Sequence, residues 1–160
     1  MTRTYLGLGS NLPDRLRNLR SAVDLIAKLP TTRVLRQSHV YEAEPVGDCG
    51  GDFLNSVVEI GTELGPRQLL QQLQEIERQL GRREPRAAPR TIDIDLLLFG
   101  DFTHTERGLV IPHPRMLQRR FVLRPLCDVA PDVMIKGRSA NEWLAALRDK
   151  QRVTRLTIED

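Results

Sequence analysis

Two stretches with helical periodicity alternate with four strand-like stretches between residues 4 and 99, and this order restricts the possible folds. The first predicted helix covers residues 13–29 and ends at Pro30, with apolar residues at helical spacing: Leu12, Leu16, Leu19, Val23 and Ile26. The second begins at Gly65-Pro66 and stops at Gly81, with a stripe of Leu69, Leu73, Ile76 and Leu80. Each helix therefore has one apolar face to bury.

Strands are predicted at residues 4–9, 34–41, 53–60 and 92–99. The resulting βαββαβ order is the ferredoxin-like arrangement, an α+β fold in which two helices cover one face of an antiparallel sheet. A C-terminal extension follows, with a last helix and a capping box at Ser139 and Glu142. The 160 residues suit one core and contain no linker-like segment, so we expect residues 1–160 to form a single domain.

The composition argues against nucleic-acid and membrane partners. A net charge of +3 and an aromatic content of 4% lack the basic surplus and stacking rings of a nucleic-acid binder. No apolar run approaches the roughly 20 residues that span a bilayer, and no signal peptide is evident, so we expect a cytoplasmic location. Cys49 and Cys127 are isolated and are interpreted as free thiols. The modest basicity favours an acidic small molecule, such as a phosphate ester.

Asp93 and Asp95 lie two positions apart in the last predicted strand. Side chains alternate along a strand, so both carboxylates project from one face, while Ile92, Ile94 and Leu96 take the face towards the helices. Two such carboxylates repel each other unless a cation joins them. Magnesium usually takes one or two protein carboxylates and completes its shell with waters and phosphate oxygens. A lone pair of this kind is also compatible with a solvated edge strand.

Four arginines precede this strand, at positions 82, 83, 86 and 90. Guanidinium groups bind phosphate through paired hydrogen bonds. A metal together with arginines recurs in phosphoryl transfer, where positioning and charge neutralisation supply most of the catalysis. Taken alone, the arginines are equally compatible with a solvated charged loop, but beside the aspartates they favour a phosphate site.

His113 and Glu77 are further candidates. Pro112 and Pro114 hold His113 in an extended backbone, where it could bond a phosphate oxygen or pass a proton, or be only a turn residue. Glu77 could meet a sugar hydroxyl or an arginine, or form a salt bridge with Arg82. The sequence has no P-loop motif, complete dinucleotide fingerprint or kinase-type catalytic loop. A nucleotide would therefore be held by a metal, arginines and backbone groups.

Motifs along nearly the whole chain resemble those of one family, the 6-hydroxymethyl-7,8-dihydropterin pyrophosphokinases of folate biosynthesis. The matching segments are 5–12 (YLGLGSNL), Tyr41 with 45–47 (PVG), 52–55 (DFLN), Glu77 with 81–82 (GR), 89–96 (PRTIDIDL), 112–116 (PHPRM), 119–123 (RRFVL), 125–126 (PL) and 130–131 (AP). The resemblance implies transfer of pyrophosphate from ATP to the hydroxymethyl group of a reduced pterin, giving the pterin diphosphate and AMP. It also implies a monomer whose partners are these small molecules.

The resemblance implies two magnesium ions that bridge the phosphates of the co-substrate ATP and are held by Asp93 and Asp95. Together with two loop arginines, these aspartates form the implied catalytic set: Arg82, Arg90, Asp93 and Asp95. The implied contacts to ATP or its phosphates, including the adenine side, come from Glu77, Arg82, Arg90, Leu96, Val110, His113 and Arg119.

On the pterin side, the resemblance implies a ring sandwiched between Phe53 and Phe121, with Asn55 paired to its edge. The other implied pterin contacts come from the segment before the third strand and from one aspartate: Ala43, Pro45, Val46, Gly47 and Asp93.

The chain departs from the family in places. Ala43 and Glu44 stand where threonine and proline are usual, and the third loop is shorter, so that either Arg83 or Arg86 serves as its second arginine. Two other functions are compatible with the sequence. A non-catalytic pterin- or nucleotide-binding module would not need the aspartate pair, because binding a pterin requires no metal. Phosphoryl or nucleotidyl transfer to another heterocyclic alcohol is left open by Ala43 and Glu44.

Overall fold

The computed structural model describes residues 1–11, 14–44, 52–81 and 92–157. Its strands are β1 (Thr2–Ser10), β2 (Thr32–Gln37), β3 (Tyr41–Ala43), β4 (Phe53–Thr62), β5 (Asp93–Phe99), β6 (His104–Glu106), β7 (Leu109–Ile111), β8 (Met134–Ile135), β9 (Arg138–Ser139) and β10 (Val153–Arg155). The helices are α1 (Arg15–Ala27), α2 (Pro66–Gln79), α3 (Arg120–Val129) and α4 (Ala140–Ala146), with a 3-10 turn at Met116–Gln118.

One antiparallel sheet forms the centre of the molecule, with strands in the order β10-β3-β4-β1-β5 and β2 also paired to β4. Strand β1 lies between β4 and β5, so its residues contact both neighbours. The pairs β6–β7 and β8–β9 form separate two-stranded hairpins. The predicted ferredoxin-like architecture is thus confirmed in its element order and antiparallel pairing.

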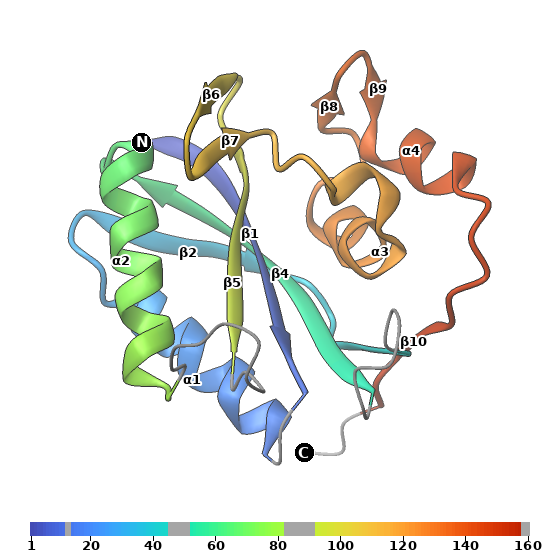
Figure 1. Cartoon of the computed structure of the whole chain (residues 1–160), viewed down its shortest axis with the longest axis horizontal. Coiled ribbons are helices and arrows are strands. Elements are labelled where there is room, and N and C mark those ends of the chain that lie inside the picture. The colour runs from blue at the N-terminus through green and yellow to red at the C-terminus, as the bar shows by residue number, and fades with distance from the viewer. Residues whose placement is uncertain (12–13, 45–51, 82–91, 158–160) are drawn as a thin grey trace.

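Helices cover both faces of the sheet, with α1 and α2 on one side and α3 and α4 on the other (Figure 1). Leu6, Leu8 and Ile94 face α1 and α2 and belong to one apolar core. Tyr5 and Leu97 belong to a second core, which α3 completes on the opposite face. The prediction placed the first two helices correctly, and the C-terminal extension adds a second packed layer.

The second predicted strand, at residues 34–41, is in fact two strands, β2 and β3. Both pair with β4. Between them, the N–H of Val57 donates to the side-chain oxygen of Ser38 (2.8 Å) instead of to a main-chain carbonyl. Because the serine hydroxyl takes the place of a backbone acceptor, the hydrogen-bond ladder between the strands is interrupted at this point, which is a known effect of serine side chains.

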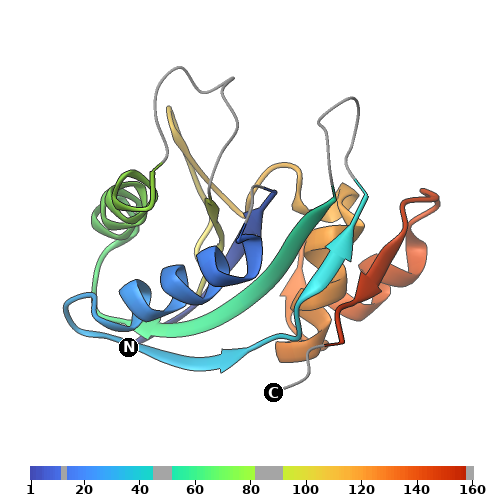
Figure 2. The same cartoon turned by 90° about the horizontal axis from the view of Figure 1, so that it is seen from below.

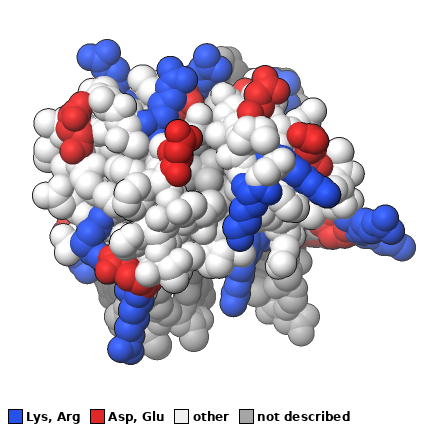
Figure 3. Space-filling model, turned by 90° about the horizontal axis from the view of Figure 1, so that it is seen from above, with Lys and Arg blue, Asp and Glu red and all other residues white. Residues whose placement is uncertain are grey.

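The capping box predicted for the last helix is present, because the Ser139 hydroxyl accepts the Glu142 N–H and Glu142 accepts the Ser139 N–H. Cys127 is a free thiol, as expected, while Cys49 lies outside the described residues. Within the described ranges, no helix is long and apolar enough to cross a membrane. On the face drawn in Figure 3, positive and negative side chains are interspersed and do not gather by sign.

Candidate functional site

A cavity of about 680 Å³ opens on the face of the sheet opposite α1 and α2. Its walls come from the central strands, from the start of α3 and from the segment after α4. The residues that line it are Gly7, Leu8, Gly9, Ala43, Glu44, Phe53, Asn55, Ser56, Val57, Asp93, Asp95, Arg115, Gln118, Arg119, Phe121, Val122, Asp149, Lys150 and Gln151. The sheet therefore brings together residues from both ends of the chain.

The floor of this cavity is built by two glycines and two aspartates on adjacent strands. In the β1–β5 register, Gly7 lies opposite Asp95, and Gly9 lies opposite Asp93. Directly opposed residues of antiparallel strands share a face of the sheet. Because the glycines have no side chains, the space above β1 stays open beside the two carboxylates. The prediction that Asp93 and Asp95 point away from the helices is confirmed by the burial of Ile94 in the opposite core.

Asn55 lies in the same cavity and is only 6% exposed. Its Oδ1 is the one buried side-chain nitrogen or oxygen in the described part of the chain without a hydrogen-bond partner. A buried acceptor left unpaired costs free energy, so native proteins usually satisfy such atoms with a ligand, water or ion. The atom therefore marks a place where a bound donor would be stabilised.

Aromatic rings line this cavity on two sides, since Phe53 comes from β4 and Phe121 from α3. The guanidinium carbon of Arg119 lies 5.5 Å from the centre of the Phe121 ring, within the range of a cation–π contact. The structure thus places both predicted stacking rings, Asn55 and Arg119 around one space. Ala43 also lines it.

A second cavity of about 370 Å³ lies between α2, β5 and the β6–β7 hairpin. It is lined by Leu70, Gln74, Glu77, Asp93, Ile94, Asp95, Leu96, Gly108, Leu109, Val110, His113 and Pro114. Asp93 and Asp95 line both cavities. The predicted nucleotide residues Glu77, Leu96, Val110 and His113 therefore lie on one side of the aspartate pair. The described pterin residues Ala43, Phe53, Asn55 and Phe121 lie on the other side, together with Arg119, which was predicted to contact the nucleotide.

Glu77 has a structural contact that sequence reasoning did not foresee. Its side chain is 5% exposed, and Oε2 accepts the backbone N–H of Ile94 at 2.8 Å. Ile94 lies between the two aspartates, so Glu77 fixes the outer edge of β5 where the carboxylates originate. A hydrogen bond to a buried charged acceptor is among the stronger kinds in proteins.

His113 is held by its backbone and by one ring nitrogen. Its N–H donates to the Leu97 carbonyl (2.9 Å), and its Nδ1 accepts the Arg115 N–H (3.2 Å). Burial lowers the pKa of His113, Asp95 opposes this shift, and Arg119 and Arg115 reinforce it. With Nδ1 as an acceptor, the neutral ring carries its proton on Nε2 and can donate it to a ligand oxygen.

Several predicted residues fall outside the described part of the chain: Pro45, Val46, Gly47, Arg82, Arg83, Arg86 and Arg90. Other lining residues were not predicted. Gln74 lies three positions before Glu77 on α2, so helical spacing could have indicated it. The lining residues Asp149, Lys150 and Gln151 follow the last helix, and no motif in the sequence indicates them.

Comparisons with known proteins agree on one family. The sequence model of the 7,8-dihydro-6-hydroxymethylpterin-pyrophosphokinase (HPPK) family matches residues 5–131. A 2-amino-4-hydroxy-6-hydroxymethyldihydropteridine pyrophosphokinase from Methylorubrum extorquens is 46% identical over 149 residues, covering 92% of this chain and 94% of the relative. The protein of the same name from Bacillus subtilis is 45% identical over 138 residues, covering 85% and 83%.

Among solved structures, an HPPK-DHPS of Plasmodium falciparum has a TM-score of 0.74 and 17% sequence identity. The similarity covers 90% of this chain and 44% of that protein, so the chain spans less than half of the solved relative. At this identity the likeness supports the fold alone.

Proposed function

This chain belongs to the 7,8-dihydro-6-hydroxymethylpterin-pyrophosphokinase family, and on that premise we propose that it catalyses the family's step in folate biosynthesis. It transfers the pyrophosphoryl group of ATP to the hydroxymethyl group of 6-hydroxymethyl-7,8-dihydropterin. The pterin oxygen forms a bond to the β-phosphorus, AMP leaves with the bridging oxygen, and the hydroxyl proton is released. One observation carries the proposal: two cavities of different chemistry meet at Asp93 and Asp95.

The larger cavity suits the pterin. A flat heterocycle with amide-like edges gains from stacking on Phe53 and Phe121 and from donating to the unpaired Oδ1 of Asn55. The two glycines of β1 leave room for the ring beside the carboxylates. We propose that Ala43, Pro45, Val46 and Gly47 complete the pterin contacts, the last three on the strength of the family motif.

The smaller cavity suits ATP. Leu70, Leu96, Leu109 and Val110 offer an apolar surface for the adenine, while Glu77 and His113 are its polar groups nearer the aspartates. The Nε2 proton of His113 is available to a phosphate oxygen. We propose that Arg82, Arg90 and Arg119 neutralise phosphate charge. Arg82 and Arg90 are assigned on the strength of the family motif, and Arg119 acts from the larger cavity, which shares Asp93 and Asp95 with the smaller one. In this arrangement the reacting groups of both substrates meet at one place, which is the main source of rate in phosphoryl transfer.

Asp93 and Asp95 would hold magnesium, which we propose as two ions. No group of three or more His, Cys, Asp or Glu side chains that could bind a metal occurs among the described residues. Two carboxylates fit magnesium nevertheless, because this ion commonly binds one or two of them and takes its remaining ligands from water and phosphate. When bound, magnesium supplies charge neutralisation and orientation of the phosphate oxygens.

We also propose that the chain forms a single catalytic domain and acts as a monomer in the cytoplasm, which the composition and the family resemblance support. A decisive assay combines the protein with ATP, magnesium and 6-hydroxymethyl-7,8-dihydropterin and measures AMP. Formation of AMP that depends on the pterin is expected. Pterin binding without AMP would indicate a non-catalytic module, and cleavage of ATP only with a different alcohol would identify a different acceptor.

A further inference from the structure

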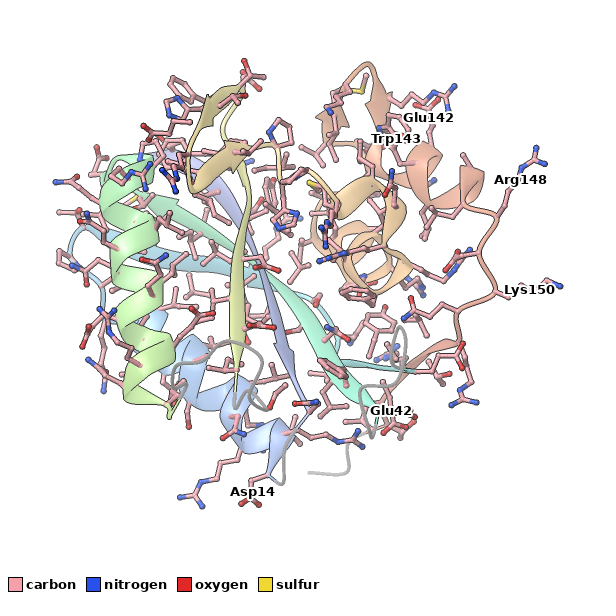
Figure 4. The ribbon with its side chains drawn as sticks, viewed as in Figure 1. Asp14, Glu42, Glu142, Trp143, Arg148 and Lys150 are labelled. Atoms are coloured by element: carbon pink, nitrogen blue, oxygen red, sulfur yellow. The ribbon has the colours of Figure 1, made fainter. Side chains whose placement is uncertain are left out.

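The segment that follows α4 returns to the sheet and forms one wall of the larger cavity. Strand β10 pairs antiparallel with β3, and the N–H of Leu156 donates to the Val40 carbonyl (2.8 Å). Figures 1 and 2 show this segment leaving α4 and running back to lie beside β3. Just before β10, residues 149–151 line the cavity. The side chains of Arg148 and Lys150 extend outwards from this segment (Figure 4).

Glu44 is the residue that connects this wall to the rest of the site. Its N–H donates to the Arg152 carbonyl (3.2 Å), and its Oε1 accepts the Arg152 N–H (2.8 Å). Its carbonyl accepts a hydrogen bond from Nε2 of Gln151 (2.9 Å). Glu44 itself lines the larger cavity next to Ala43. Its carboxylate thus accepts a main-chain donor of the wall, and a residue without a side-chain acceptor could not make this contact.

Arginine contacts also support this region. Arg152 reaches the Asp52 carboxylate at 3.4 Å, yet its side chain is 66% exposed, and ion pairs this exposed are weak. Arg15 of α1 donates to the Asp52 carbonyl (2.7 Å) and also pairs with Glu42, which is labelled in Figure 4. Asp52 is therefore also held from α1, and Asp149 is held from α3 by two hydrogen bonds from the Arg120 guanidinium (3.1 and 2.8 Å). The Glu44 carboxylate is the side-chain acceptor that holds the main chain at Arg152, next to residues 149–151.

We propose that Glu44 is a positioning residue that holds residues 149–151 in place as a wall of the pterin cavity, so that pterin affinity depends on its side-chain oxygen acceptor. The inference rests on the proposed function, because it takes the larger cavity as the pterin site. It concerns a residue that has no part in the chemistry of the aspartates. In the proposed function ATP binds on the other side of Asp93 and Asp95, so the affinity for ATP should not change when Glu44 is substituted.

The test compares Glu44→Ala with Glu44→Gln. The alanine variant removes the acceptor for the Arg152 N–H, and we expect the KM for the pterin to rise about three- to tenfold, with kcat and the KM for ATP unchanged. Glutamine keeps an oxygen acceptor and loses only the charge, so it should restore a KM close to that of the unmodified protein. Arg155→Ala is the matched control, since it changes an exposed arginine of β10 whose side chain has no hydrogen bond or ion pair among the described residues, while the main-chain pairing with β3 is kept.

Amide hydrogen exchange supplies a readout independent of activity. Exchange at Arg152 and the flanking 149–156 amides should speed up in Glu44→Ala and stay slow in Glu44→Gln. The inference is overturned if the pterin KM of Glu44→Ala is unchanged, if the KM for ATP rises by the same factor, or if glutamine fails to rescue. If the unmodified protein forms no AMP, the proposed function fails, whereas the exchange result still shows whether Glu44 seats the wall.

Discussion

Gly9 provides a direct test of the proposed pterin site, because a methyl group at this position would clash with Asn55. The two residues are paired across β1 and β4. A Cβ placed at position 9 would lie 2.9 Å from Asn55 Nδ2, well inside the roughly 3.5 Å of favourable van der Waals contact. Gly9 lies within a strand and does not have a positive φ, so alanine adds no backbone strain. The effect of Gly9→Ala should therefore be confined to the displaced amide.

The magnitude follows from the hydrogen bonds at stake. If the amide of Asn55 makes two hydrogen bonds to the pterin, each worth about 0.5–1.5 kcal/mol, their loss weakens binding by about 1–3 kcal/mol. We therefore expect the Kd of the pterin to rise about 5- to 150-fold. Affinity for ATP should not change, since Gly9 and Asn55 line only the larger of the two cavities.

Isothermal titration of the pterin, with magnesium and a non-hydrolysable ATP analogue present, measures this change. Gly65→Ala is a control at a glycine that lines neither cavity and where the added Cβ would meet its nearest atom at 3.7 Å. If Gly9→Ala acts through Asn55, the double variant with Asn55→Ala should bind no worse than Asn55→Ala alone. Fully additive losses, or unaltered binding by Gly9→Ala, would refute the argument.

Three further predictions concern the aspartates, the edge of β5 and the alkaline limit of stability. Asp95→Ala should cut AMP formation by several orders of magnitude with little effect on pterin binding. Removal of magnesium with a chelator should have the same two effects. Normal turnover in either case would contradict the metal assignment. Glu77→Ala leaves the Ile94 N–H without its acceptor, so urea unfolding should show a loss of about 1–3 kcal/mol, and a smaller loss in Glu77→Gln. Burial and the hydrogen bond to Glu59 raise the pKa of Tyr5 to about 12, above the unfolded value near 10. The contribution of Tyr5 to stability is therefore fully present below pH 10 and is lost as the pH rises towards 12. Thermal unfolding of Tyr5→Phe should depend less on pH in that window, and an unchanged dependence would argue against the shift.

Local patterns were sufficient to predict much of the fold and part of the site. The alternation in residues 92–96 correctly separated the two aspartates from the isoleucines, because side-chain direction in a strand depends only on position. The helical stripes correctly indicated α1 and α2. The assignment of Asn55, Phe53 and Phe121 to one site came from the family resemblance, and the structure places all three around one cavity.

Features that depend on distant pairing could not be predicted in this way. Strand β10 has only three residues, and its partner β3 lies far away in the sequence. No local periodicity marks so short a strand, and its pairing depends on where the rest of the chain has folded. For the same reason, the sequence indicated Glu44 only as an unusual charge near the site, because its contacts with Arg152 depend on this distant pairing.

The pairing of β10 with β3 also determines which edge of the sheet is exposed. An unpaired strand edge offers a row of free N–H and C=O groups to any neighbouring chain. Here β10 occupies the edge of β3, and the new edge that it presents is short and carries the exposed Thr154 and Arg155. A charged, three-residue edge is a poor template for addition of another strand. Loss of this segment would therefore leave a binding surface for foreign β-strands as well as an incomplete cavity.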